Sequence, residues 1–131
     1  MVWEESMKKK IPKCKWALKK PYYVTKDDTR YKKYMKQLIT TGISDDETWD
    51  LFCVIAEFTL PRLKRFKKIP FGYPGNITSE EWDRILGEMI FAFEYALMDD
   101  DEQEHLKMRK GYYRYKRGMK LFTQYYLHLW T

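Results

Sequence analysis

The chain has 131 residues, of which 44% are hydrophobic and 18% aromatic, a composition that excludes disorder of the whole chain and predicts one globular domain. No stretch approaches about eighteen consecutive uncharged apolar residues, and lysines interrupt the N-terminal region, so the sequence predicts neither a membrane span nor a signal peptide. We therefore expect a soluble cytoplasmic protein, in which Cys14 and Cys53 stay reduced.

The formal net charge of +6 hides a strong segregation of charge along the chain. Residues 1–26 carry eight lysines and two glutamates, and residues 106–131 carry seven basic residues and no acid. Residues 27–105, by contrast, hold ten bases and seventeen acids. Two basic ends of this size suit an anionic partner or an acidic surface of the same protein.

The N-terminal region has no helical or strand period, and it contains Pro12 and Pro21. We interpret residues 1–24 as an irregular basic arm, followed by a helical bundle over residues 25–131. A first helix is predicted over residues 26–40, because Thr25 is a suitable N-cap, apolar residues then repeat at helical spacing, and a glycine follows.

A capping box of Ser44 and Glu47 predicts that a second helix begins at Asp45. Its apolar residues surround much of the helix circumference, so we expect this helix to be the central one of the bundle. Pro61 removes a hydrogen-bond donor within it, and because the apolar pattern runs on to Phe66, we expect a kink at Pro61 rather than a break.

Thr78 and Glu81 form a second capping box, which begins a third helix. The last helix, about residues 103–129, has apolar residues with a 3.5 period, and Gly111 and Gly118 beside that seam predict close approach of a neighbour. The sequence thus predicts an all-α, single-domain antiparallel bundle of about four helices. Its expected core contains Trp49, Phe52, Ile55, Trp82, Leu86, Met89 and Phe93.

Three basic groups are candidate partner-binding or phosphate-binding surfaces. Four cations of the last helix, with no acid beyond Glu104 to balance them, have a 3-4-3 spacing: Lys107, Lys110, Arg114 and Arg117. Five bases end the second helix: Arg62, Lys64, Arg65, Lys67 and Lys68. The arm interleaves lysines with aromatic residues, as segments that bind nucleic acid do: Lys13, Lys15, Trp16, Lys19, Lys20, Tyr22 and Tyr23.

Each group also has a structural alternative. The cations of the last helix can be a solvated face that acids of neighbouring helices neutralise in part. The bases after the second helix complement its dipole. The arm can be a strap whose aromatic side chains dock on the protein's own bundle.

No motif for catalysis, metal, nucleotide or cofactor binding stands out. Glu102 and His105 match half of a di-iron signature, but the second half is missing. Cys53 lies in an apolar run, and Cys14 has no identifiable base beside it. We therefore expect a protein that is not an enzyme and that uses no metal and no cofactor.

Several segments carry a resemblance to small helical proteins encoded by bacteriophages and prophages, a family with no assigned reaction. The similar segments include Ser44–Trp49, Leu60–Phe66, Gly72–Gly75, Thr78–Trp82, Met89–Ile90, Ala92–Phe93, Gly118, Leu121–Phe122, Tyr126 and Leu129–Trp130. The resemblance covers most of residues 44–131 and leaves the arm uncovered. It implies a viral origin, hence the cytoplasm of a bacterial host, and it lends no functional site.

A small helical protein without catalytic motifs is expected to act by binding. Our leading hypothesis is a phage-encoded accessory protein that binds a host protein or nucleoprotein complex. An inhibitor of a host nucleic-acid-targeting defence system, of the anti-CRISPR type, is one form of it, by analogy alone. The alternatives are direct binding of nucleic acid and an oligomeric structural phage component, for instance a homodimer through the heptad seam. No membrane partner is expected.

Overall fold

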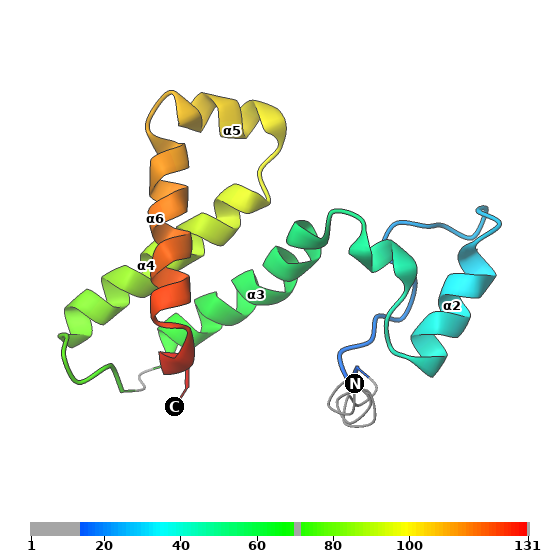
Figure 1. The fold of residues 1–131 in the computed structure, drawn as a ribbon, viewed down its shortest axis with the longest axis horizontal. Coiled ribbons are helices and arrows are strands. Elements are labelled where there is room, and N and C mark those ends of the chain that lie inside the picture. Colours follow the sequence, from blue (N-terminus) through cyan, green and yellow to red (C-terminus); the bar gives the residue numbers. More distant parts are fainter. Residues whose placement is uncertain (1–13, 70–71, 131) are drawn as a thin grey trace, which may run out of the picture. The chain divides into compact units, whose positions relative to one another are not determined.

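The structure is a computed structural model that describes residues 14–69 and 72–130. The regular secondary structure of these residues is entirely helical, with five α-helices and no strand, which confirms the all-α class. Contacts divide the chain into two compact units that meet in sequence between Leu51 and Phe52 (Figure 1). This boundary differs from the one predicted after residue 24, because the described part of the arm belongs with the first unit.

In the first unit, helix α2 spans Tyr31–Thr40 and begins later than the predicted residue 26. The preceding residues form turns, in which the Asp28 carboxylate accepts hydrogen bonds from the backbone and the guanidinium of Arg30 at 2.8–3.0 Å. Such local bonds of an aspartate compete with helix formation. Gly42 closes the segment as predicted, with a φ of 83° that favours glycine.

The predicted capping box of Ser44 and Glu47 is present, but it begins only the short 3₁₀ helix η1, Asp45–Thr48. The helix does not continue, because Trp49 is extended and Asp50 has a φ of 44°. The prediction that the second helix begins at Asp45 is therefore wrong, and the next α-helix begins at Leu51.

Helix α3, Leu51–Lys68, begins at the last residue of the first unit and otherwise belongs to the second, and it runs through Pro61 as one element. Helix α4 spans Ser79–Ala96, and the Thr78 side chain caps it by accepting a hydrogen bond from the backbone of Glu81 at 3.1 Å. This confirms the predicted start of the third helix. The kink at Pro61 stays a prediction.

The predicted last helix is two helices, α5 over Asp100–Lys107 and α6 over Gly111–Gln124, followed by the 3₁₀ turn η2, Tyr126–His128. The break lies at Lys110, which is left-handed with a φ of 62°. A Cβ on Gly111 would lie 2.7 Å from the carbonyl oxygen of Leu106, so only glycine fits this tight turn.

Helix α6 crosses α4 in the second unit (Figure 1). At Gly118 an added Cβ would collide with the carbonyl oxygen of Glu88 and lie 2.7 Å from the Cβ of Ala92. The close approach predicted beside the glycines of the last helix is therefore confirmed. It brings the apolar stripe of α6 onto α4.

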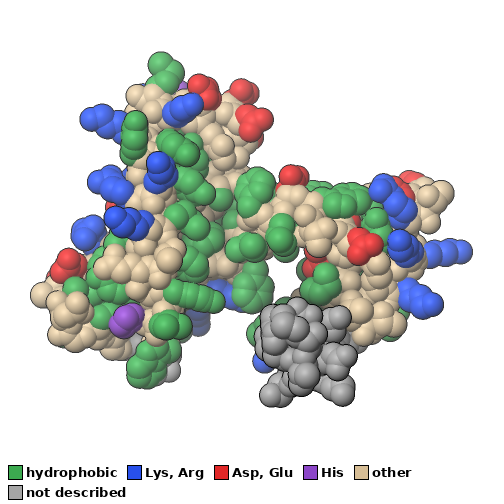
Figure 2. Space-filling model, viewed as in Figure 1, with side chains coloured by type: hydrophobic (Ala, Val, Ile, Leu, Met, Phe, Trp, Pro, Cys, Tyr) green, Lys and Arg blue, Asp and Glu red, His purple; other side chains and the backbone are tan. Residues whose placement is uncertain are grey.

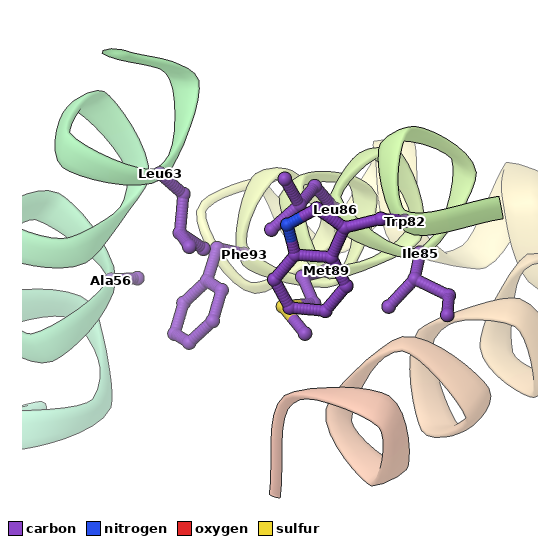
Figure 3. Close-up of a cluster of buried hydrophobic side chains, with 7 residues drawn as sticks. All are labelled: Ala56, Leu63, Trp82, Ile85, Leu86, Met89 and Phe93. Carbon is purple, nitrogen blue, oxygen red and sulfur yellow. The ribbon is translucent and has the colours of Figure 1, made fainter. Parts of the chain in front are cut away.

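Helix α4, and not α3, is the centre of the core in the second unit (Figure 3). Of the predicted core residues, four are at most 5% exposed and are confirmed: Trp82, Leu86, Met89 and Phe93. Three are exposed by 38–57%, so that part of the prediction is wrong: Trp49, Phe52 and Ile55. Helix α3 contributes only Ala56 and Leu63 to the buried cluster, and its Leu60 and Phe66 pack against that cluster while partly exposed.

Candidate functional site

The four cations predicted to form one face of the last helix do not lie together. Lys107 belongs to the last turn of α5, where it lines a hollow with Asp100 and Glu104. Arg114 donates two hydrogen bonds to the carboxylate of Glu88 on α4, at 2.9 and 3.2 Å. Its guanidinium also lies 4.0 Å from the ring centroid of Phe91. Arg114 therefore joins α6 to α4.

The structure instead brings five side chains together around a shallow hollow of about 720 Å³ on α6. We call this surface the α6 basic face, and its members are Lys110, Tyr113, Lys116, Arg117 and Lys120. Four of them follow one another at 3-4-3 spacing, Lys110, Tyr113, Arg117 and Lys120, which aligns them along one exposed side of the helix, away from the buried Gly118. Figure 2 shows Lys and Arg side chains gathered along α6.

The cations of the α6 basic face are not neutralised. In the described part of the chain none of its four cations forms an ion pair: Lys110, Lys116, Arg117 and Lys120. Helix α6 also carries no acidic residue of its own. The Lys116 ammonium lies 5.5 Å from the ring centroid of Tyr112. Tyr113, the aromatic member of the face, is 65% exposed. The surface therefore combines uncompensated positive charge with an accessible aromatic ring.

Sequence reasoning found two members of this face, Lys110 and Arg117, and missed Tyr113, Lys116 and Lys120. The signal was present, since Tyr113 and Lys120 continue the same 3-4-3 spacing as Lys110 and Arg117. The prediction of one unbroken last helix hid this spacing, because it placed Lys107 on the same face as Lys110, Arg114 and Arg117.

The basic group at the end of α3 is mostly structural. Lys64 lies 3.4 Å from Glu94, and Lys67 lies 3.0 Å from Asp83, so both join α3 to α4. Arg62 donates to the carbonyl oxygen of Phe58, and its guanidinium lies 3.8 Å from that ring. The remaining two members of the group are exposed: Arg65 and Lys68.

In the arm, two of the predicted contact residues lie on the arm's own unit. Tyr23 stacks on Trp49 with ring centroids 5.9 Å apart, and Tyr22 meets Tyr23 edge-on at 4.6 Å. The Lys15 ammonium lies 4.7 Å from the ring of Trp16, which is 56% exposed. Other predicted members of the group are exposed: Lys19 and Lys20. Lys13 lies outside the described residues.

Asp46 anchors this part of the arm from a fully buried position. Its carboxylate accepts hydrogen bonds from the backbone N–H groups of Tyr23 and Val24 at 2.8 and 3.0 Å, and from the Ser44 hydroxyl at 2.5 Å. Burial raises the pKa of Asp46, but these hydrogen bonds together outweigh it and hold the pKa below its usual value. The strap alternative therefore fits residues 22–24.

The predicted heptad seam of the last helix is used within the second unit. Met119, Phe122 and Leu129 pack against the buried cluster, and Tyr115 stacks on Tyr95 at 4.9 Å. These residues of the seam are covered within the second unit, whereas three other residues of the seam are exposed by 41–85%: Met108, Tyr112 and Tyr126. Assembly through the seam stays a prediction.

An apolar surface remains on α3. Phe52, Ile55 and Phe58 are 40–57% exposed. Beside them a groove of about 510 Å³ runs between α3 and the C-terminal residues, lined by Phe58, Thr59, Arg62, Leu63, Phe66, Phe122, Tyr126, Leu127 and Leu129. The prediction that this helix is buried around much of its circumference is wrong.

Among the described residues, no group of three or more His, Cys, Asp or Glu side chains is arranged to hold a metal ion. Cys14 and Cys53 do not form a disulfide, and both are half-buried. No helix in residues 14–69 and 72–130 has the length and apolar character that crossing a bilayer requires. No family model, no curated protein and no solved structure matches the chain.

Proposed function

We propose that this protein acts by binding an anionic macromolecular partner through the α6 basic face, and not by catalysis. The observation that carries the proposal is the set of four cations on one exposed side of α6 that no acidic side chain of the described chain neutralises. Like charges this close repel one another, and an anionic partner relieves that repulsion.

The acidic residues near α6 pair with, or lie beside, groups other than the cations of the α6 basic face. Glu88 of α4 accepts hydrogen bonds from Arg114 of α6. The acidic run that begins α5 is separate, with Asp99 capping the helix and repulsion from Asp99 raising the pKa of Glu102. The cations of the α6 basic face thus have no acidic partner among the described residues, which suits binding of an external anionic ligand.

Our leading candidate for the partner is a host protein or nucleoprotein complex, the hypothesis made for a small phage-like protein without catalytic motifs. An inhibitor of a host nucleic-acid-targeting defence system is one form of the proposal. The apolar surface of α3 can add contact area to such a complex, since stable interfaces combine an apolar core with a polar rim.

Affinity purification of the tagged full-length chain from an expressing bacterial host, followed by mass spectrometry, tests the proposal. One variant changes every cation of the α6 basic face: Lys110→Gln, Lys116→Gln, Arg117→Gln and Lys120→Gln. A matched control removes four exposed lysines of the first unit: Lys26→Gln, Lys32→Gln, Lys33→Gln and Lys36→Gln. Gln keeps good helix propensity, so both variants should fold.

We expect a partner that copurifies with the wild type and with the control, and that is lost from the α6 variant. Arg114 is left unchanged because its substitution would also weaken the contact between α6 and α4. A partner retained by the α6 variant in full would show that binding runs through another surface, and the proposal would then be abandoned.

A further inference from the structure

The α6 basic face has a repeating charge along its length. Its cations extend from Lys110 to Lys120, a distance of about 15 Å at the 1.5 Å rise of an α-helix. A small anion would satisfy one or two of them, whereas a polymer with regularly spaced charges can satisfy all four. The spacing therefore favours a polyanion over a single phosphate group.

The aromatic ring of the face, that of Tyr113, narrows the choice of polyanion. Tyr113 is 65% exposed and stands among cations rather than in an apolar patch. It meets Tyr112 edge-on at 6.4 Å, and Tyr112 is itself 41% exposed and lies beside Lys116. Exposed rings between cations are the combination with which proteins bind single strands, whose bases stack while the phosphates pair.

The two other polyanions use only part of this arrangement. A duplex keeps its bases stacked on one another, so a protein ring has no base face to cover, and Tyr113 would contribute little. An acidic peptide would neutralise the cations and gain nothing particular from the exposed ring. Only a single strand uses the cations and the ring together.

We infer that the α6 basic face binds single-stranded nucleic acid, with phosphates on Lys110, Lys116, Arg117 and Lys120 and a base stacked on Tyr113. This inference deepens the proposed function and rests on it. It needs no particular base sequence, because every base has a face on which an aromatic ring stacks.

Fluorescence anisotropy with a labelled twenty-nucleotide oligothymidylate tests the inference on the full-length protein. The same measurement is made with a duplex of equal length and with a polyglutamate competitor, each at about 50 and about 200 mM salt. The variants are the fourfold α6 variant, its fourfold control in the first unit, Tyr113→Ala and Tyr113→Phe. Circular dichroism verifies that each variant is folded.

We expect the wild type to bind the single strand more tightly than the duplex. The fourfold α6 variant should flatten the log–log salt slope by up to about 2.8, at about 0.7 for each lost phosphate contact of a single strand. Tyr113→Ala should weaken binding on the order of 10- to 100-fold, the effect of losing one stacked base, and Tyr113→Phe should restore most of it. The control should stay within about threefold of the wild type, because its lysines lie outside the face.

Several outcomes would overturn the inference. Tighter binding of the duplex would assign the face to double-stranded nucleic acid. Equal competition by polyglutamate, with Tyr113→Ala unchanged, would assign it to an acidic protein. Single-strand binding that survives the fourfold α6 variant would place the nucleic acid elsewhere on the chain.

The two proposals fail separately. If the single strand does not bind but the α6 variant still loses its copurifying partner, the inference falls and the proposed function stands. If the α6 variant keeps that partner, the proposed function falls whatever the oligonucleotide does.

Discussion

Replacing Gly118 by Ala tests the contact between α6 and α4 on which the second unit depends. Gly118 is buried, and a Cβ at this position would meet the carbonyl oxygen of Glu88 and the Cβ of Ala92, both on α4. One of these atoms belongs to the backbone and cannot rotate away. The substitution should therefore force the two helices apart.

The net effect follows from two opposing contributions. Overpacking a filled contact costs about 1–3 kcal/mol, and we expect the upper end because the obstacle is backbone. Alanine is more favourable than glycine in a helix interior by about 1 kcal/mol. The free energy of unfolding should thus fall by about 2 kcal/mol, which lowers Tm by roughly 8–16 °C for a unit of this size.

Gly87→Ala is the matched control, since Gly87 also lies in a helix of the same unit. A Cβ there would have only Cε of Lys67 nearby, at 3.8 Å, an ordinary contact. We expect this variant to be more stable than the wild type by up to about 1 kcal/mol. The same substitution should therefore have opposite signs at the two glycines.

Urea unfolding followed by far-ultraviolet circular dichroism measures both variants against the wild type. If Gly118→Ala is as stable as the wild type or more so, then α6 does not approach α4 this closely. The assignment of α4 as the centre of the core would then be wrong as well.

Three further outcomes are expected. Trp82→Ala should lower the free energy of unfolding by about 3–5 kcal/mol, because its indole is 5% exposed in the core; a loss below about 1 kcal/mol in urea unfolding would contradict this. Asp46→Asn should destabilise the first unit by about 1–3 kcal/mol near neutral pH, since the amide has one acceptor oxygen where the carboxylate has two, and the donors that face its NH2 group lose their acceptor. Because the folded-state pKa of Asp46 is depressed, the stabilisation by its carboxylate is present above about pH 4 and is lost as the pH falls through that pKa. In thermal melts at decreasing pH, Tm of the variant should therefore fall less steeply with pH than Tm of the wild type. An equally steep fall of Tm in both proteins would refute the lowered pKa of Asp46. Arg114→Gln should cost about 0.5–1 kcal/mol through its exposed pair with Glu88 and leave partner capture unchanged, whereas lost capture would place Arg114 in the binding surface.

The sequence by itself determined the local features of this protein. The cap at Thr78, the end of α2 at Gly42 and the capping box at Ser44 all depend on side chains and backbone groups a few residues apart. The apolar period of α4 was equally readable, since a continuous stripe at 3.6 spacing has only one way to be buried. For that reason the all-α class and the Trp82 to Phe93 part of the core follow from sequence alone.

Only the tertiary structure decided that the helix predicted from Asp45 stops after Thr48, that the last helix breaks at Lys110, and which charges stay free. The helix predicted from Asp45 stops after Thr48, at the extended Trp49 and the left-handed Asp50. Within that short helix Asp46 accepts hydrogen bonds from backbone donors more than twenty residues away, a contact that no local pattern reveals. The sequence does not distinguish paired from unpaired basic residues. The structure does, because Arg114 pairs with Glu88 and Lys67 pairs with Asp83. Among the described residues, the cations around Tyr113 stay unpaired after the helices have packed. The sequence could not show this, because ion pairing depends on distances between elements and not on spacing within one element.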